Sequence, residues 1–140
     1  AQTMEDGCGI YRLAETMQQT CDKLDELKDR FRNVNVEDKS GVWNTEWLLA
    51  IELEYQLDVA QSMAHSALQR RESRGAHQRL DGFEQRDDVN FLRHSQAHYV
   101  AGGPPRIDYG PVKITKSQPG TRAYGAAGEK AEQERKASHA

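Results

Sequence analysis

Apolar side chains recur every three or four positions along residues 13–34, which is the spacing of one face of a helix. The other positions are mostly polar, with Glu15 in the first turn and Arg30 and Arg32 in the last, where the helix dipole favours each charge. The pattern therefore predicts an amphipathic helix. Its apolar face comprises Leu13, Met17, Cys21, Leu24, Leu27, Phe31 and Val34.

A second helix is predicted to begin near Asn44 or Thr45, since either side chain can cap free N–H groups. The polar residues 35–41 form the expected loop between the two helices. Arginines up to Arg74, followed by Gly75, predict where this helix ends, because cations suit a helix C-terminus and glycine adopts the left-handed conformation found there. Two apolar stripes predict that this helix is the more buried of the two and has contacts on two sides. The stripes are Trp47, Leu48, Ile51, Tyr55 and Val59, and Leu49, Leu53, Leu57, Ala60, Ala64 and Leu68.

Shorter units follow the second helix. Asp87 can cap a short helix that extends through Leu92. Strand-like runs at residues 98–100 and 106–109 flank a turn rich in glycine and proline, and a further run follows at residues 112–115. These runs predict a small antiparallel ribbon, whose prolines restrict it to an edge position.

The elements together predict a mainly α fold with three parts. Residues 1–96 are expected to form a three-helix-bundle-like (spectrin-repeat-like) domain, and residues 97–124 a short C-terminal antiparallel β extension packed on it. Residues 125–140 lack large apolar side chains and are predicted to be a disordered tail.

Composition excludes several classes of protein. The chain has 140 residues, the size of one domain, and a net charge of -3, which disfavours a general nucleic-acid binder. No stretch approaches the roughly 20 apolar residues of a membrane span. Cys8 and Cys21 form no CxxC pair and fit reduced thiols. The opening residues have neither an initiator Met nor an export signal, so we expect a piece of a longer protein.

Short chemical motifs are absent or incomplete. Gly7 and Gly9 begin like a dinucleotide fingerprint, but Arg12 occupies the next required glycine position and no apolar strand precedes them. His94 and His98 have the spacing of two metal ligands on a helix, but the helix is expected to end near His94. No serine has the Gly-x-Ser-x-Gly context of a nucleophile. We therefore predict no catalytic, cofactor-binding or metal-binding residue in this chain.

Charged side chains are densest between residues 70 and 88. Guanidinium groups beside carboxylates form bidentate pairs that can fix a loop against another surface, and the same arginines could instead hold a dicarboxylate or a phosphate. Charge runs are more often solvated or paired than part of a substrate site, which favours a structural or docking network. The candidate docking residues are Arg74, His77, Arg79, Arg86, Asp87 and Asp88.

Four longer strings carry a family resemblance. They run Met4–Arg12 (MEDGCGIYR), Glu72–Asp81 (ESRGAHQRLD), Arg86–Leu92 (RDDVNFL) and Val112–Thr115 (VKIT). In this order they closely resemble the C-terminal region of bacterial fumarate reductase flavoprotein subunits. The ESRG string followed by RDD is shared with succinate dehydrogenase and, more loosely, with L-aspartate oxidase, which stay open as alternatives. A free-standing helical interaction module is the other alternative.

The resemblance implies a helical domain appended to a flavin-binding domain and a capping domain that precede this chain. In that family, covalently attached FAD passes a hydride to fumarate and an arginine delivers the proton. Electrons arrive through the iron–sulfur clusters of a partner subunit from quinol, and membrane anchor subunits hold the complex at the inner face of the cytoplasmic membrane. None of the family's catalytic or flavin-linking residues falls within this chain.

Two hypotheses follow for the chain itself. In the first, it is inactive alone and supports the flavin-binding and capping domains, with a contact to the iron–sulfur subunit. In the second, Arg74, His77 or Arg79 reaches the edge of the substrate site and contributes to dicarboxylate binding. One departure affects the first helix: the family commonly begins it with Thr-Pro, whereas this chain has Leu13 and Ala14.

Overall fold

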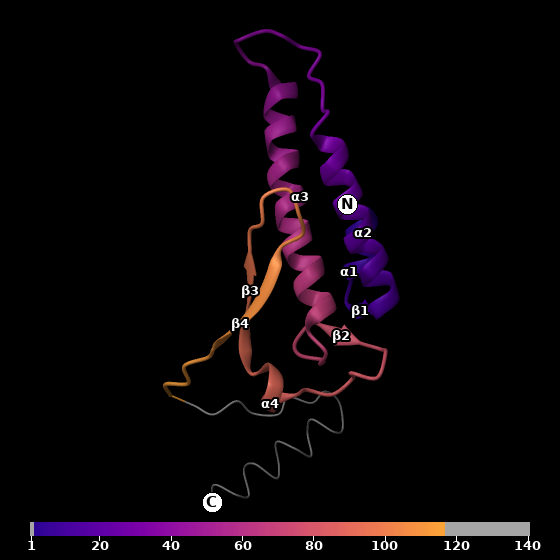
Figure 1. The fold of residues 1–140 in the computed structure, drawn as a ribbon, viewed down its shortest axis with the longest axis vertical. Coiled ribbons are helices and arrows are strands. Elements are labelled where there is room, and N and C mark those ends of the chain that lie inside the picture. Colours follow the sequence, from indigo (N-terminus) through magenta and orange to yellow (C-terminus); the bar gives the residue numbers. More distant parts are fainter. Residues whose placement is uncertain (1, 117–140) are drawn as a thin grey trace, which may run out of the picture.

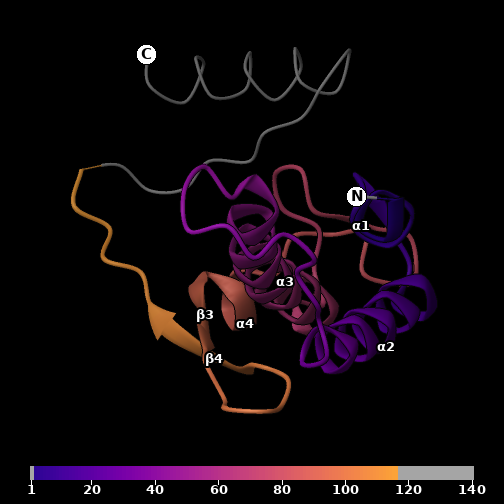
Figure 2. The same cartoon turned by 90° about the horizontal axis from the view of Figure 1, so that it is seen from above.

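Two long antiparallel helices form the body of the fold in the computed structural model, which describes residues 2–116 (Figure 1). They are α2, Ala14–Phe31, and α3, Thr45–Gln69, joined by the loop of residues 32–44. A short helix, α1, spans Gln2–Cys8 and packs on α2. Viewed from above, α3 lies between α2 on one side and an antiparallel ribbon on the other (Figure 2). The predicted fold class, mainly α with a short antiparallel ribbon, is confirmed.

The buried core lies between α2 and α3. Its centre is formed by Cys21, Leu24, Leu57 and Ala64, with Met4 and Cys8 of α1 packed against it. α1 approaches α2 closely at Gly7, where an added Cβ would lie 1.7 Å from the hydroxyl oxygen of Thr20. The sequence pattern did not predict this helix, because seven residues are too few to show a helical period and tertiary packing supplies its stability.

The second helix begins where the sequence predicted. Asn44 is its N-cap, and the Asn44 side chain accepts a hydrogen bond from the backbone N–H of Trp47 at 2.8 Å. The predicted end near Arg74 is wrong, because α3 stops at Gln69 and Arg70 is extended (φ -78°, ψ 101°). The Arg70 guanidinium donates to the carbonyls of Phe91 and Arg93, and these distant contacts draw the chain out of the helix.

Gly75 also differs from its predicted role as a helix terminator. Its φ of 59° is in the left-handed region, but it lies in a tight turn in which Arg74 and His77 exchange backbone hydrogen bonds of 2.9 and 3.0 Å. A parallel pair of two-residue strands lies beside this turn: β1, Tyr11–Arg12, and β2, Gln78–Arg79.

The burial predicted for α3 is only half correct. The C-terminal half contacts α2 and the ribbon, and Leu57, Gln61 and Ala64 are buried. The N-terminal half is exposed: Trp47 is 61% exposed and Tyr55 is 64% exposed. α3 has 25 residues against 18 in α2, so its first turns extend beyond the end of its neighbour.

The remaining elements follow the second helix. Asp87 caps the short helix α4, Asp88–Phe91, as predicted. The ribbon consists of β3, Arg93–His98, and β4, Arg106–Pro111. It therefore begins earlier than the predicted run at residues 98–100, and residues 112–115 form no strand. The predicted disordered tail, residues 125–140, lies outside the described residues. Within residues 2–116, none of the helices has the length and apolar character to cross a membrane.

Candidate functional site

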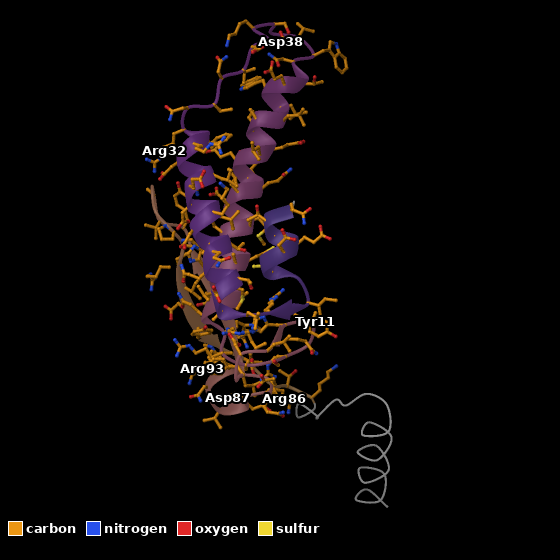
Figure 3. The ribbon with its side chains drawn as sticks, turned by 90° about the vertical axis from the view of Figure 1, so that its right-hand side faces the viewer. Tyr11, Arg32, Asp38, Arg86, Asp87 and Arg93 are labelled. Atoms are coloured by element: carbon orange, nitrogen blue, oxygen red, sulfur yellow. The ribbon has the colours of Figure 1, made fainter. Side chains whose placement is uncertain are left out.

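The predicted cluster of charges lies at the end of the bundle where α3 stops. In Figure 3, Arg86, Asp87 and Arg93 gather at this end, far from Asp38 in the loop between α2 and α3. The cluster forms because residues 70–92 turn back repeatedly beneath α3, so that side chains distant in sequence meet. It contains two groups, one centred on Glu72 and one on Arg79.

Glu72 is the centre of the first group. Its side chain is fully buried and accepts hydrogen bonds from Arg74 Nε at 2.8 Å, from the backbone N–H of Asp87 at 2.8 Å, and from Arg70. Burial alone would raise the pKa of this carboxyl, but the hydrogen bonds from Arg74, Asp87 and Arg70 outweigh it and hold the Glu72 pKa below its usual range. Glu72 is therefore an ionised interior anchor that joins the end of α3 to the segment before α4.

The outer side of this group is partly exposed. Arg74 Nη2 donates to Asp88 Oδ1 at 2.5 Å, and Arg86 Nη2 lies 2.8 Å from Asp88 Oδ2. The hydrogen bond from Arg74 holds the pKa of Asp88 below its usual range. Asp87 accepts from two backbone N–H groups at the start of α4. These side chains form a fixed row of charges at the surface.

Arg79 organises the second group from the interior, where it is 2% exposed. Its Nε and Nη2 donate to the two oxygens of Asp81 at 2.8 and 2.6 Å, and its Nη1 donates to the carbonyls of Leu68 and Arg70. Asp81 Oδ2 also accepts from the backbone N–H of Ala14 at 2.7 Å. Helix α2, whose own N-cap residue Leu13 makes no side-chain cap, is thus capped by a residue distant in sequence.

His77 connects this group to α1. Its Nδ1 lies 2.7 Å from Arg12 Nη1 and its Nε2 lies 3.0 Å from the carbonyl oxygen of Arg70. Arginine can only donate and a carbonyl can only accept, so Nδ1 is the acceptor and the proton is on Nε2. Burial, together with the nearby arginines, lowers the pKa of His77, so the ring is neutral. Arg12 also donates to the carbonyls of Cys8 and Gly9 at the end of α1.

The six predicted residues therefore fall into the two groups. Arg74, Arg86, Asp87 and Asp88 belong to the group around Glu72, and His77 and Arg79 belong to the other. Arg70 joins the groups, because its side chain binds Glu72 and its carbonyl accepts from both His77 and Arg79. The sequence reasoning missed four members of the network: Arg12, Arg70, Glu72 and Asp81. All four lie within the quoted strings or the dense segment, but only the fold shows which partner each one meets.

This arrangement limits the chemistry that the network can perform. Arg79 uses four hydrogen bonds within the chain and is buried, so the structure lends little support to its direct contact with a dicarboxylate. Within residues 2–116 no three His, Cys, Asp or Glu side chains converge on a metal-sized site. His94 and His98 lie on one strand, where four residues span about 13 Å, too far for one metal ion. The network as described is a structural element with a partly exposed row of charges.

Comparison with known proteins shows where this arrangement belongs. The family described as fumarate reductase flavoprotein C-term matches residues 1–124. The chain belongs to this family. The fumarate reductase flavoprotein subunit of Haemophilus influenzae is 58% identical over 134 residues, covering 96% of this chain and 22% of the relative. That of Proteus vulgaris is 60% identical over 125 residues, covering 89% and 21%.

A solved structure shares the fold as well as the sequence. An E. coli quinol fumarate reductase chain superposes with a TM-score of 0.83 at 55% identity, over 86% of this chain and 21% of that one. A succinate dehydrogenase flavoprotein subunit of Rickettsia bellii is more distant, at 32% identity over 114 residues, covering 81% of this chain and 19% of the relative. The chain spans about a fifth of the length of the flavoprotein subunits that it matches.

Proposed function

We propose that this chain is the C-terminal helical domain of a fumarate reductase flavoprotein subunit, an FAD-dependent oxidoreductase that interconverts fumarate and succinate. The supporting observation is the 58% identity to such a subunit over 96% of the chain. The alternative, a succinate dehydrogenase subunit, has less support, because the identity to the Rickettsia bellii relative is 32%.

FAD and the substrate belong to the rest of the subunit in this proposal. The described residues do not fit a flavin, because Gly7 lies inside α1 against Thr20 and no loop of backbone N–H groups is available for a pyrophosphate. Electrons reach the flavin from quinol through the iron–sulfur clusters of a partner subunit. Anchor subunits then place the complex at the inner face of the cytoplasmic membrane. The chain alone is inactive.

The contribution of this domain is mechanical support. Glu72 fixes both Arg74 and the backbone of Asp87, so the partly exposed row formed by Arg74, Arg86, Asp87 and Asp88 is held in one geometry. A preorganised row of charges loses less side-chain entropy on association than flexible side chains do. The row is therefore suited to contact the flavin-binding and capping domains or the iron–sulfur subunit.

The experiment uses the full-length subunit with its iron–sulfur partner. The double variant Arg86→Ala with Asp88→Asn removes two partly exposed charges of the row and leaves Glu72 its three donors. We expect FAD content to be unchanged and co-purification with the partner, or turnover of fumarate, to fall. The matched control is Arg106→Ala with Asp108→Asn, an exposed ion pair on the ribbon, which should change neither.

The outcomes separate the two parts of the proposal. Wild-type subunit that contains no FAD and reduces no fumarate would refute the assigned activity. Wild-type activity together with unaltered assembly and turnover in the double variant would refute the docking role of the charged row, while leaving the activity in place.

A further inference from the structure

The most unusual surface of the molecule is the N-terminal part of α3 together with the residues before it. We call residues 42–63 the α3 arm. Nine large apolar side chains of the arm are at least 45% exposed, and Trp43 is 94% exposed. They are Val42, Trp43, Trp47, Leu48, Leu49, Leu53, Tyr55, Val59 and Met63.

The size of this surface indicates that it is covered in the working protein. The three aromatic side chains alone expose on the order of 300–500 Å², whereas soluble monomers rarely expose a contiguous apolar patch of more than a few hundred Å². With the six aliphatic side chains, the arm reaches the roughly 800 Å² per partner that a stable interface buries. A helix that is apolar on most of its circumference is typical of the interior of a large protein.

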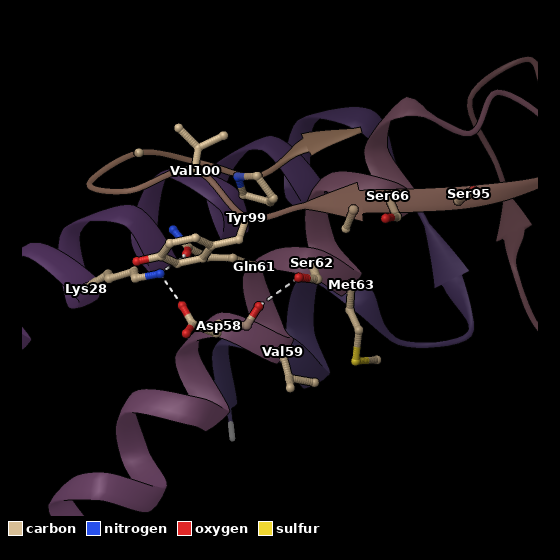
Figure 4. Close-up of a pocket in the computed structure, with 13 residues that line it drawn as sticks. Lys28, Asp58, Val59, Gln61, Ser62, Met63, Ser66, Ser95, Tyr99 and Val100 are labelled. Carbon is tan, nitrogen blue, oxygen red and sulfur yellow. Dashed lines mark hydrogen bonds and ion pairs between the residues drawn. The ribbon is translucent and has the colours of Figure 1, made fainter. Parts of the chain in front are cut away.

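The arm continues into a groove. Trp47, Tyr55, Val59 and Met63 lie on one i, i+4 row of α3, which extends for about 24 Å. The last two of these side chains line a cavity of about 520 Å³ between α3 and the ribbon, which Tyr99 borders on the opposite side (Figure 4). The row and the groove form one elongated apolar surface that is long enough for an entire helix of a partner.

The charges on α3 indicate which partner fits. Between Thr45 and Gln69 the helix has no Lys or Arg, and its charged residues are Glu46, Glu52, Glu54 and Asp58. Lys28 of α2 pairs with Asp58, while Glu52 and Glu54 are exposed. A second copy of this chain would place carboxylates against carboxylates, which disfavours self-association through this face.

We infer that the α3 arm is a permanent docking surface for the part of the same polypeptide that lies outside this chain. The surface covering it is apolar and presents Lys or Arg side chains to Glu52 and Glu54. This inference rests on the proposed function, because it requires the longer flavoprotein subunit. The chain spans about a fifth of such subunits, so most of the polypeptide is covalently tethered to this domain and is present at high effective concentration. Transient partners generally use smaller and less apolar surfaces.

The test is hydroxyl-radical footprinting of the full-length subunit, read by mass spectrometry on the peptide that contains Trp43 and Trp47. These are the two tryptophans of the chain, so one peptide reports on the arm. The reference for full exposure is the same subunit unfolded in urea. We expect native oxidation to be at least ~5-fold slower, because side chains now 61–94% exposed become buried at the interface.

A pair of variants provides a second measurement. Trp47→Asp adds a carboxylate to the four already on the arm and should increase proteolysis within residues 32–44 of the full-length subunit. The matched control is Val89→Asp, at an 85% exposed position of α4, which should leave proteolysis within residues 32–44 unchanged.

Three results would overturn the inference. The first is oxidation of Trp43 and Trp47 in a native, FAD-containing subunit at the urea rate, which would leave the proposed function intact. The second is protection that appears only when the iron–sulfur subunit is added. The third is protection that increases with subunit concentration, which would identify a second copy as the occupant. A subunit without FAD would instead refute the proposed function.

Discussion

Asp81 joins three parts of the chain through one carboxylate, and its removal is the most informative perturbation of the network. Its oxygens pair with Arg79, which is 2% exposed, and with the backbone N–H of Ala14 at the start of α2. Asp81→Ala would leave a buried guanidinium without a counter-ion and an N-terminal helix donor without an acceptor.

The magnitude follows from these two losses. Removing one partner of a buried ion pair costs about 3–5 kcal/mol, and the lower value applies because the Asp81 side chain is 18% exposed. Loss of a helix cap costs about 1 kcal/mol. We therefore expect Asp81→Ala to lower the free energy of unfolding by about 4 kcal/mol, a large share of the 5–15 kcal/mol typical of a domain.

Ala14→Pro separates the two contributions. Proline has no N–H, so this variant removes the cap while leaving the pair between Arg79 and Asp81 intact. Leu13 already has the extended backbone (φ -117°, ψ 143°) that a residue before proline requires, and proline is favourable at the first helical position. We expect Ala14→Pro to change stability by less than about 1 kcal/mol, since preorganisation offsets the lost bond.

The assay is urea unfolding followed by far-ultraviolet circular dichroism, applied to the wild type, both single variants and the double variant. In the Ala14→Pro background, Asp81→Ala should lower the free energy of unfolding by about 1 kcal/mol less than it does in the wild type, because the cap is already absent there. A loss below about 1 kcal/mol for Asp81→Ala alone would refute the reasoning, since it would mean that Arg79 does not depend on its carboxylate partner.

Three further predictions concern α1, His77 and the thiols. Gly7→Ala places a Cβ 1.7 Å from the Thr20 hydroxyl, so we expect α1 to separate from α2 and its amide hydrogen exchange to accelerate, whereas Gly41→Ala, with no atom within 4 Å, should change nothing. The pKa of His77 is lowered in the fold, so stability is complete above its ordinary pKa of about 6.5 and decreases as the pH falls below it. Urea midpoints measured between neutral and acidic pH should show this decrease, and His77→Gln should make that part of the curve flatter. Burial raises the pKa of Cys21 to about 12, so iodoacetamide at mildly alkaline pH should leave Cys21 unmodified in the native chain and alkylate it once urea is added, as peptide mass spectrometry would show.

The sequence predicted the elements whose determinants are local. The period of the apolar residues located α2, and the side chain of Asn44 located the start of α3, because a helix cap acts on residues within one turn. Asp87 located α4 in the same way. In each case, the residues that determine the structure are adjacent to the structure that they determine.

The sequence did not predict the features that depend on distant contacts. α3 ends at Gln69 because Arg70 is held by carbonyls more than twenty positions away. α2 begins without a cap of its own because Asp81 supplies one. The spacing of residues in the sequence identifies neither the contacts of Arg70 nor those of Asp81. All charged residues in this dense segment have similar neighbours in the sequence, so the local pattern does not distinguish one from another.

The candidate site and the α3 arm show that the local pattern also fails to predict which side chains are buried. Charges in the segment of residues 70–88 suggested an outward-facing surface, but the most buried of them, Glu72 and Arg79, interact with the chain itself. The apolar stripes of α3 suggested an interior, but Trp47 and Tyr55, which belong to these stripes, are exposed. Periodicity shows that a helix face will be covered, and it does not distinguish a neighbouring helix in the same domain from another domain. The position of the arm relative to α2 makes this distinction, because the first turns of α3 extend beyond the only long helix that could cover them within residues 2–116.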